Sequence, residues 1–203
     1  MNDRAAKLVE FFKEIEKFKT VERKLWTSDM KRKESDADHA WHICMMIILM
    51  EQELKGKVDI LHSMKLALTH DLVEIYAGDE LTFTKNKKLA VIEEEKAAKK
   101  LQQQLPDDLG KEIYDLWIEY EERKTPDAKL VQALDKLEPV LQNLVSEGKS
   151  WRENNITFEM MLDNKYSHIE ENKDHKLLSE IYMRVIDEAK DFFENDFKQV
   201  KKK

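Results

Sequence analysis

The most informative segment of the chain spans residues 59–79 and reads DILHSMKLALTHDLVEIYAGD. Its apolar residues recur with the period of an α-helix, and Asp59 is placed to cap the first turn. The segment therefore predicts a helix over residues 59–76, which a glycine two residues later interrupts. Late in this helix, Asp71 follows His70 after an apolar run, where a carboxylate is costly to bury unless it is paired or bound to a cation.

The composition of the whole chain predicts an almost wholly helical protein. It has 203 residues, of which 41% are hydrophobic, a length that suits one domain with a single sizeable core. Only four glycines and three prolines are present, far below the roughly 12% that average usage would supply. Turns must therefore be few, which excludes a β-sandwich or barrel with a turn about every 8 to 12 residues. We expect an all-α fold, a single compact multi-helix domain over residues 1–203.

Charge and cysteine content narrow the classes of function. The formal net charge of −7 gives no general attraction to nucleic acid or to an anionic membrane. The single cysteine, Cys44, excludes an internal disulfide and fits a reducing compartment. The longest apolar run, residues 43–50, is too short to cross a bilayer, and the N-terminus has no signal-peptide pattern. We therefore expect a cytoplasmic protein without nucleic-acid or membrane partners.

Helical periodicity and cap residues predict further helices along the chain. Including the segment above, they cover about residues 3–18, 36–50, 59–76, 88–105, 106–123, 125–147, 157–172 and 174–197. The start signal at Thr125-Pro126-Asp127 is strong, because a hydroxyl N-cap, a proline in the first turn and a carboxylate near the positive dipole end occur together. Residues 20–34 are expected to be irregular, and the helices within 157–197 to pack on the domain or form a dimer interface.

Histidines and carboxylates from three predicted helices could meet at one metal site. His39 stands in the first turn of one helix, His70-Asp71 near the end of the next, and Asp135 in the middle of a third. Two imidazoles and two carboxylates form a mixed nitrogen and oxygen donor set for one divalent cation. This set suits manganese, cobalt, iron, nickel or zinc, and magnesium less well. Glu74 lies one turn after His70, over the same patch of helix surface.

Each of these residues, taken alone, has an ordinary structural explanation. A chain of this composition is expected to contain about 0.5 His-Asp pairs by chance, so the pair by itself is weak. His42 is expected to pack behind His39, one turn away, and Trp26 fits a core or interface position about as well as a pocket. The remaining histidines are expected to face solvent among charged residues, and they are His62, His168 and His175.

The ordered set of motifs resembles the HD-domain phosphohydrolases, whose pattern is a lone histidine, then His-Asp, then a distant aspartate. The matching positions are His39, His70-Asp71 and Asp135. The finer pattern is similar to the branch that contains the 5′-deoxynucleotidases, and its motifs here are Glu34-Ser35, Asp38-His39, His70-Asp71-Leu72-Val73-Glu74, Gly78-Asp79, Leu105-Pro106, Tyr120-Glu121 and Leu134-Asp135-Lys136-Leu137-Glu138. The resemblance covers about residues 21–148. Isoleucine follows Glu74, which excludes the His-Asp-x-x-Glu-Asp pattern of the guanosine-tetraphosphate hydrolases.

The resemblance implies a divalent-metal-dependent phosphomonoesterase that releases phosphate from nucleoside 5′-monophosphates by attack of a metal-bound water. The implied metal ligands are His39, His70, Asp71 and Asp135. The implied catalytic residues are Asp71 and Glu74, of which Glu74 manages the proton of the water. The implied substrate-binding residues are Trp26, Asp79 and Glu121. Relatives are often dimeric, so a homodimer is expected.

One departure from the family concerns the cation that binds the phosphate. An arginine or glycine often stands directly before the family's tryptophan, whereas Trp26 follows Lys24 and Leu25. The cations at positions 31–33 could replace it. Two other functions stay open, a nucleotide-sensing metal-binding module without turnover and a helical interaction protein with no site. The presence of all four proposed ligands favours the enzyme.

Overall fold

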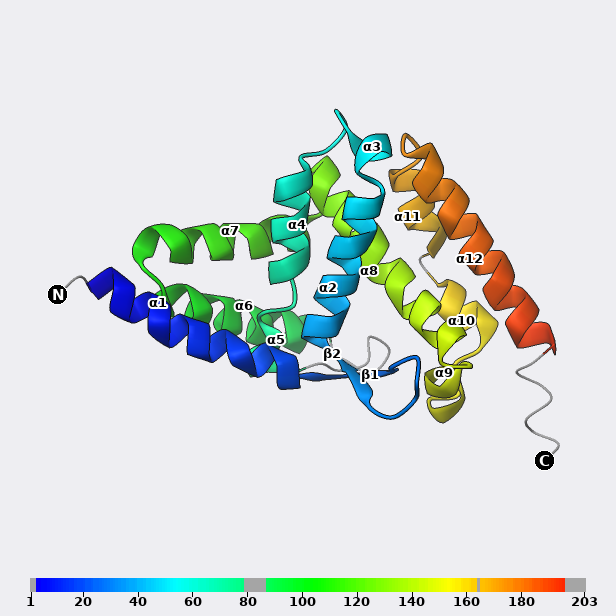
Figure 1. The fold of residues 1–203 in the computed structure, drawn as a ribbon, viewed down its shortest axis with the longest axis horizontal. Coiled ribbons are helices and arrows are strands. Elements are labelled where there is room, and N and C mark those ends of the chain that lie inside the picture. The colour runs from blue at the N-terminus through cyan, green and yellow to red at the C-terminus, as the bar shows by residue number, and fades with distance from the viewer. Residues whose placement is uncertain (1–2, 79–86, 164, 196–203) are drawn as a thin grey trace.

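The computed structural model describes residues 3–78, 87–163 and 165–195 (Figure 1). This part of the chain is helical apart from one small antiparallel sheet of two strands, which agrees with the expected all-α fold. The helices are α1 (Asp3–Glu14), the 3-10 helix η1 (Ile15–Thr20), α2 (Asp36–Leu49), α3 (Glu51–Leu54), α4 (Ile60–Thr69), α5 (Glu74–Ala77), α6 (Lys87–Gln104), α7 (Asp107–Glu122), α8 (Pro126–Val145), α9 (Lys149–Glu153), α10 (Phe158–Leu162), α11 (Lys165–Glu171) and α12 (Lys176–Asn195). Within the described ranges, no helix combines the length and the apolar character that crossing a membrane requires.

Two helices of the site begin at sequence-encoded caps. Ser35 precedes α2, and its hydroxyl accepts from the backbone N–H of Asp38, while the Asp38 carboxylate accepts from the N–H of Ser35 in return. The predicted start of α8 is confirmed, because the Thr125 hydroxyl accepts from the N–H of Ala128 and Pro126 opens the helix. These caps fix where His39 and Asp135 stand in their helices.

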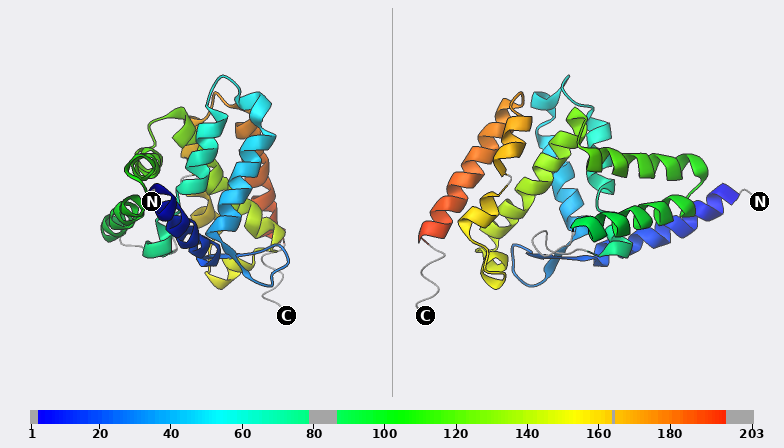
Figure 2. Two further views of the ribbon diagram at one scale, coloured as in Figure 1. Left: turned by 60° about the vertical axis from the view of Figure 1, so that its left-hand side comes forward. Right: turned by 180° about the vertical axis from the view of Figure 1, so that it is seen from behind.

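Most buried apolar residues form a main core around α8, with α2, α4, α7 and α12 packed against it. α12 lies along the outer side of α8, and its apolar face is buried there, with the Tyr182 hydroxyl donating to the carbonyl of Ala133 (Figure 1). A second, smaller core joins α1, η1, α6 and α7, which extend together toward the N-terminal end of the molecule (Figure 2). The C-terminal helix is therefore a packing element of the fold.

The expected helix over residues 59–76 is divided in the structure. α4 ends at Thr69, residues 70–73 turn through i to i+3 hydrogen bonds, and α5 follows. The break lets α4 bury Leu66 in the main core while Leu72 is buried in the second core. A continuous helix was the wrong prediction, because a tight turn preserves apolar spacing and periodicity alone cannot separate the two.

The expectation of an irregular segment at 20–34 was also wrong. Residues Glu22–Trp26 and Lys33–Ser35 form the antiparallel strands β1 and β2, here called the hairpin. Both strands are short and rich in charge, so they carry little of the apolar alternation by which a strand is recognised. The helix predicted over residues 157–172 is likewise divided, into α10 and α11, and α9 was not predicted.

Candidate metal centre

The structure brings His39, His70, Asp71 and Asp135 together where α2, the 70–73 turn and α8 meet. Oδ1 of Asp135 lies 3.1 Å from Nε2 of His39, and Oδ2 of Asp71 lies 3.1 Å from Nε2 of His70. The two crossed distances, Asp71 to His39 and Asp135 to His70, are both 4.0 Å. Bonds of about 2.0–2.2 Å to a central ion place ligand atoms about 3–4 Å apart, so these spacings fit one cation.

His70 supplies the clearest sign that a cation fits here. Its Nδ1 donates to the carbonyl of Ala67 at 2.9 Å, so Nε2 is the ring nitrogen left to face Asp71 and a cation. Nε2 is buried and makes no hydrogen bond to any described residue, while it points at the Asp71 carboxylate. A buried basic nitrogen is rarely left without a partner, and a metal ion would provide one.

His39 is held between two carboxylates of α8. Nε2 donates to Oδ1 of Asp135 at 3.1 Å, and Nδ1 donates to Oε2 of Glu138 at 3.0 Å. Burial and the charge of Arg23 lower the pKa of His39, but the hydrogen bonds that His39 makes to the Asp135 and Glu138 carboxylates outweigh them and raise it to about 9. Both ring nitrogens of His39 thus face carboxylate oxygens, and a metal ion would take the place of a proton on Nε2.

Neighbouring cations lower the pKa of both carboxylates in the cluster, Asp71 and Asp135. Burial alone would raise the pKa of Asp135, but Lys136 and His39 hold it well below its ordinary value. Oδ2 of Asp135 also accepts from the Tyr120 hydroxyl at 2.6 Å, so Oδ1 is the oxygen turned toward the histidines. Burial opposes ionisation of Asp71 as well, and His70 and Arg23 together lower its pKa.

The comparisons with known proteins agree with this geometry. The family model described as HD domain matches residues 15–176. The chain belongs to the HD domain family. It is 36% identical over 174 residues to 5′-deoxynucleotidase HDDC2 of Dictyostelium discoideum, covering 79% of this chain and 90% of that protein. It is 34% identical over 142 residues to the Homo sapiens protein of the same name, covering 68% and 67% of the two chains.

The fold is also found in a solved HD domain relative. A crystal structure described as a predicted metal-dependent phosphohydrolase from Magnetospirillum magnetotacticum superposes with a TM-score of 0.82 at 34% identity. The match covers 93% of this chain and 94% of that one. These comparisons confirm the predicted family and fold, and they support the predicted hydrolase class.

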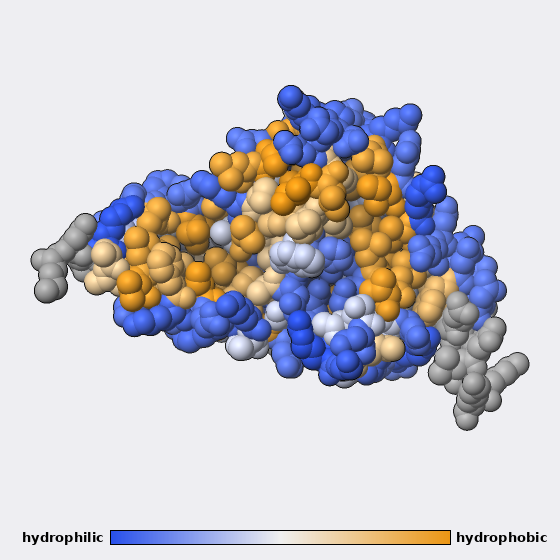
Figure 3. All heavy atoms as spheres, in the orientation of Figure 1, coloured by the Kyte–Doolittle hydropathy of each residue, from blue (hydrophilic) through white to orange (hydrophobic). Residues whose placement is uncertain are grey.

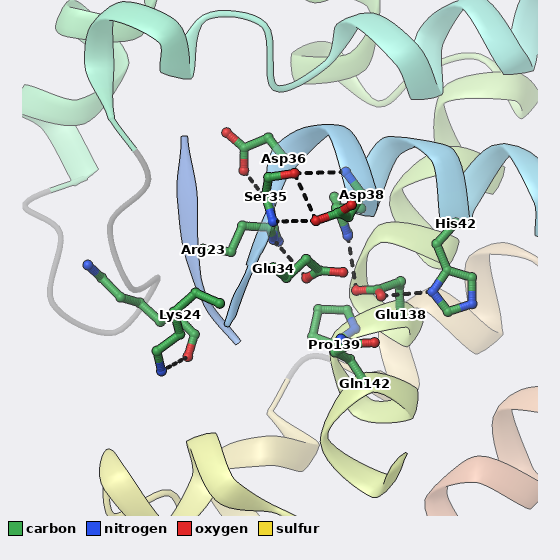
Figure 4. A network of polar contacts seen from close by, with 12 residues as sticks. Arg23, Lys24, Glu34, Ser35, Asp36, Asp38, His42, Glu138, Pro139 and Gln142 are labelled. Atoms are coloured by element: carbon green, nitrogen blue, oxygen red, sulfur yellow. Dashed lines mark hydrogen bonds and ion pairs between the residues drawn. The ribbon is translucent and has the colours of Figure 1, made fainter. Parts of the chain in front are cut away.

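Arg23 is a site residue that the sequence analysis missed. Its side chain is only 13% exposed, and Nη1 donates to Oδ2 of Asp71 at 2.9 Å and approaches Oδ1 of Asp36 at 3.4 Å. Nε lies 3.5 Å from Glu34, and Figure 4 shows this group of charges beside the hairpin. The sequence analysis missed Arg23 because it did not predict that residues 22–26 form a strand beside the site.

The cations proposed from the sequence lie elsewhere in the hairpin. Arg32 pairs with Asp38 and Lys33 with Glu153, while Lys31 lies 3.4 Å from Asp29. Lys136 does reach the site, because its Nζ lies 2.6 Å from Oδ2 of Asp135. Among the residues that the structure describes, Arg23 and Lys136 are thus the Lys and Arg side chains that reach the cluster.

Glu74 is joined to the cluster through its backbone, and Glu121 lies close enough to Asp71 and His70 to interact with their charges. Glu74 is the first residue of α5, and its backbone N–H donates to the carbonyl of Asp71 at 2.9 Å. Glu121 is on α7, where desolvation and then the charge of Glu94 raise its pKa, opposed by Lys136. Asp79, the third of the carboxylates expected near the cluster, lies outside the described residues.

Trp26 is at the end of β1 and contacts α9. Its indole Nε1 donates to Oε2 of Glu153 at 2.8 Å. The ammonium groups of Lys33 and Lys149 lie 4.2 and 3.1 Å from the centre of its ring. The Gln142 amide donates to the Trp26 carbonyl at 2.8 Å, which ties the strand to α8. Trp26 therefore connects the hairpin to both α8 and α9.

The predicted burial of the other histidines was right for His42 and wrong for His168 and His175. His42 packs behind His39, as expected, and its Nδ1 donates to Oε1 of Glu138 at 2.9 Å. His168 and His175 are buried, so the prediction that they face solvent was wrong. The segment that holds α11 and the residues just before α12 folds back onto α8 and α10, which buries both rings, although charged groups such as Arg123 and Lys57 stay close to them.

Proposed function

We propose that this HD domain protein is a divalent-metal-dependent phosphohydrolase that releases phosphate from nucleoside 5′-monophosphates. The observation that carries the proposal is the convergence of two imidazoles with two ionised carboxylates at spacings that fit one cation. The names of the relatives, 5′-deoxynucleotidase in each case, support the nucleotide as substrate.

The ligands that would hold the cation are His39, His70, Asp71 and Asp135. When bound, the cation supplies Lewis acidity, which polarises a phosphoryl oxygen and lowers the pKa of water. The two imidazoles favour manganese, cobalt, iron, nickel or zinc over magnesium. Asp71 has two roles in this arrangement, because it would bind the cation through the oxygen that also receives Arg23.

The remaining charged side chains would act on the substrate itself. Arg23 offers a planar guanidinium and Lys136 a point charge, and each would bind oxygens of the phosphate. Glu74 would accept a proton from the attacking water and deliver it to the 5′ oxygen as the phosphorus–oxygen bond breaks. The products are then a nucleoside and inorganic phosphate.

The nucleoside would lie between the hairpin and α7. Trp26 offers an aromatic ring at the end of β1, and Glu121 offers a carboxylate on α7. A sugar hydroxyl can donate to such a carboxylate, and a base can stack on an indole. Asp79, which follows α5 in the chain, would contact the sugar as in the family. Substrate specificity is thus proposed to depend on Trp26, Asp79 and Glu121.

Phosphate release by the purified protein tests this function. We expect turnover of nucleoside 5′-monophosphates with added manganese, cobalt or zinc, and its loss with a chelator or in Asp71→Ala. Asp108→Ala is the matched control, because it removes an exposed carboxylate of α7 that pairs with Arg4. A folded, metal-loaded protein that releases no phosphate from deoxyribo- or ribonucleotides would contradict the proposal and favour a nucleotide sensor.

We further propose that the protein is a cytoplasmic homodimer, and that the copies meet on the face made by α2 and α4. Exposed apolar side chains gather on these two helices, among them Trp41, Leu49 at 77% exposed, Leu61 at 66% exposed and Leu68. Figure 3 shows a broad apolar surface over this face. The C-terminal helix is less suited to this role, since its apolar side is buried inside the chain. Light scattering should give a dimer for the wild type and a monomer for Leu49→Glu.

A further inference from the structure

Two pairs of side chains, each three residues apart, face each other across α2 and α8. His39 and His42 are on one helix, and Asp135 and Glu138 are on the other. Residues at this spacing lie on the same side of a helix, so the four groups form one polar contact between the helices. His39 contacts both carboxylates, and Glu138 in turn contacts both imidazoles. Figure 4 shows Glu138 and His42 facing each other in this contact.

Glu138 is completely buried, and both of its oxygens are used. Oε2 accepts from Nδ1 of His39 at 3.0 Å, and Oε1 accepts from Nδ1 of His42 at 2.9 Å. Glu138 is not one of the four positions of the family pattern, which are the lone histidine, the His-Asp pair and the distant aspartate. Its contacts are with a proposed ligand, with the histidine behind it, and with the carboxyl of Glu34, whose pKa burial and the charge of Glu138 raise to about 8.

The consequence for His39 follows from the chemistry of imidazole. A neutral ring carries a proton on one nitrogen and a lone pair on the other, and its metal ligand atom is the nitrogen with the lone pair. A carboxylate can only accept at Nδ1, so it keeps the proton there and leaves Nε2 for the cation. The carbonyl of Ala67 accepts from Nδ1 of His70 in the same way, but it is a backbone group and cannot be removed by mutation.

We propose that Glu138 is a positioning residue of the metal centre, which fixes the tautomer and the ring orientation of His39, and that His42 holds Glu138 in place. The inference rests on the proposed metal site. Under it, α8 provides the cation both with a ligand, Asp135, and with the group that aims a second ligand from α2. Two of the four ligand positions then depend on the packing of α8 against α2.

A carboxylate that only stabilises the fold would also lie between two helices. The test therefore needs a control, a second histidine–carboxylate pair between two other helices. His62 and Glu119 provide it, because Nε2 of His62 lies 2.8 Å from Oε2 of Glu119 and joins α4 to α7 away from the four ligands. Removal of Glu119 breaks a contact between helices of the same chemical kind. It also removes an acceptor of the Thr125 hydroxyl, 2.5 Å away at the start of α8, but Glu119 contacts neither His39 nor Glu138.

The experiment measures the affinity for Co²⁺, by competition with a chelator, in the full chain. We expect Glu138→Ala to weaken Co²⁺ binding about 10–100-fold, the usual effect of removing a partner of a ligating histidine. Glu138→Gln should weaken it less, since the amide oxygen still accepts from Nδ1 but carries no charge. His42→Ala should have a smaller effect than Glu138→Ala, and Glu119→Ala should have none.

Nitrogen-15 NMR of the imidazoles in the Zn²⁺-loaded protein gives a second readout. In the wild type, the His39 signals should show a protonated Nδ1 in a hydrogen bond and a zinc-bound Nε2. We expect Glu138→Gln to move the Nδ1 proton signal upfield, because a neutral acceptor forms a weaker hydrogen bond. This variant keeps the shape of the side chain, so it decides the question even if Glu138→Ala does not fold.

The outcomes are distinct. The proposal is overturned if a folded Glu138→Ala or Glu138→Gln binds Co²⁺ as tightly as the wild type, or if Glu119→Ala weakens binding equally. It is also overturned if the Nδ1 proton of His39 keeps its wild-type signal in Glu138→Gln. Failure of the proposed function is seen separately, in the wild type. A wild type that binds no Co²⁺ would overturn both the proposed function and this inference. A wild type that binds metal but releases no phosphate would overturn the proposed function alone.

Discussion

Two walls of the site are held in different ways. The helical wall, formed by α2 and α8, is buried around His39, whose ring nitrogens contact Glu138 and Asp135 at 3.0 and 3.1 Å. The hairpin wall, formed by β1 and β2, is buried where Arg23 meets Glu34, but its outer part is held by charged pairs that are partly open to solvent, such as Lys33 with Glu153. The helical wall thus resembles the core of a protein, whereas the outer part of the hairpin wall resembles its surface.

This difference predicts different responses to change. Removing one partner of a buried charged pair leaves an uncompensated charge and destabilises by about 3–5 kcal/mol, whereas exposed pairs contribute about 0.2–1 kcal/mol. The helical wall can therefore keep the ligand atoms in a fixed geometry. The hairpin wall can adjust its side chains when a substrate enters, with Arg23 as its one described side chain that reaches a proposed ligand.

The largest effect is expected from Asp135→Ala on the helical wall. The change removes a ligand oxygen, so Co²⁺ affinity should fall by more than the roughly 100-fold upper range for an indirect partner. It also leaves the buried Tyr120 hydroxyl without its acceptor at 2.6 Å. Metal content after dialysis measures the effect, and Asp127→Ala, a carboxylate at the start of the same helix, should retain the metal. A metal-replete Asp135→Ala would show that this wall does not bind the cation.

Arg23→Ala is expected to have the next largest effect. Loss of a charged hydrogen bond to the phosphate is worth about 1.5–3 kcal/mol, so KM for a nucleoside 5′-monophosphate should rise about 10–100-fold. Arg23→Lys should recover part of this, since it restores the charge without the planar fork. Arg32→Ala is the control, because Arg32 belongs to the hairpin but pairs with Asp38. An unchanged KM in Arg23→Ala would remove the hairpin from phosphate binding.

The helical wall was largely predictable from the sequence. His39, His70 and Asp135 stand in or at the ends of helices with readable caps, so local signals place them well. Their convergence came from the ordered resemblance to a family rather than from any local property. The separation of α4 from α5 escaped prediction because a tight turn has nearly the same apolar spacing as a helix.

The hairpin wall was not predictable, for a physical reason. The sequence of its strands does not show which side chains face the site. Contacts with other elements decide this, such as the hydrogen bond from the Gln142 amide to the Trp26 carbonyl. Arg23 is buried because Asp71, Asp36 and Glu34 surround it, and those partners are far apart in sequence. Burial of His168 has a similar origin, since Arg123 donates to its Nδ1 from the end of α7.

A smaller effect is expected where the two walls join, at the cap of α2. Ser35→Ala removes the acceptor for the N–H of Asp38 and should lower the free energy of unfolding by about 1 kcal/mol. Thr157→Ala, which removes the equivalent cap of α10, should cost about the same in urea unfolding while leaving Co²⁺ affinity unchanged. A loss of more than about 2 kcal/mol in Ser35→Ala would mean that this cap contributes more than an ordinary helix cap, as a contact within the buried helical wall would.

The same junction gives a pH dependence. Arg32 and then Ser35 lower the pKa of Asp38 to about 2, although partial burial opposes them. Because the pKa is lower in the folded state than in the unfolded chain, this contribution to stability is present above about pH 4 and is lost as the pH falls toward 2. Unfolding of Asp38→Asn should therefore depend less on pH in this window than unfolding of the wild type.

The smallest effect is expected from Glu153→Gln on the hairpin wall. The variant loses the charge that pairs with Lys33 at 3.0 Å, but its amide oxygen can still accept from the indole of Trp26. We expect a loss of about 0.2–1 kcal/mol in urea unfolding, and this difference should shrink as NaCl rises from about 0.05 to about 1 M, since exposed charges are screened. Glu138→Gln, which changes the same chemical group in the buried wall, should show a larger difference that salt does not alter. Equal salt dependence in the two variants would mean that both walls have the same electrostatic environment, and the distinction between a fixed and an adjustable wall would no longer hold.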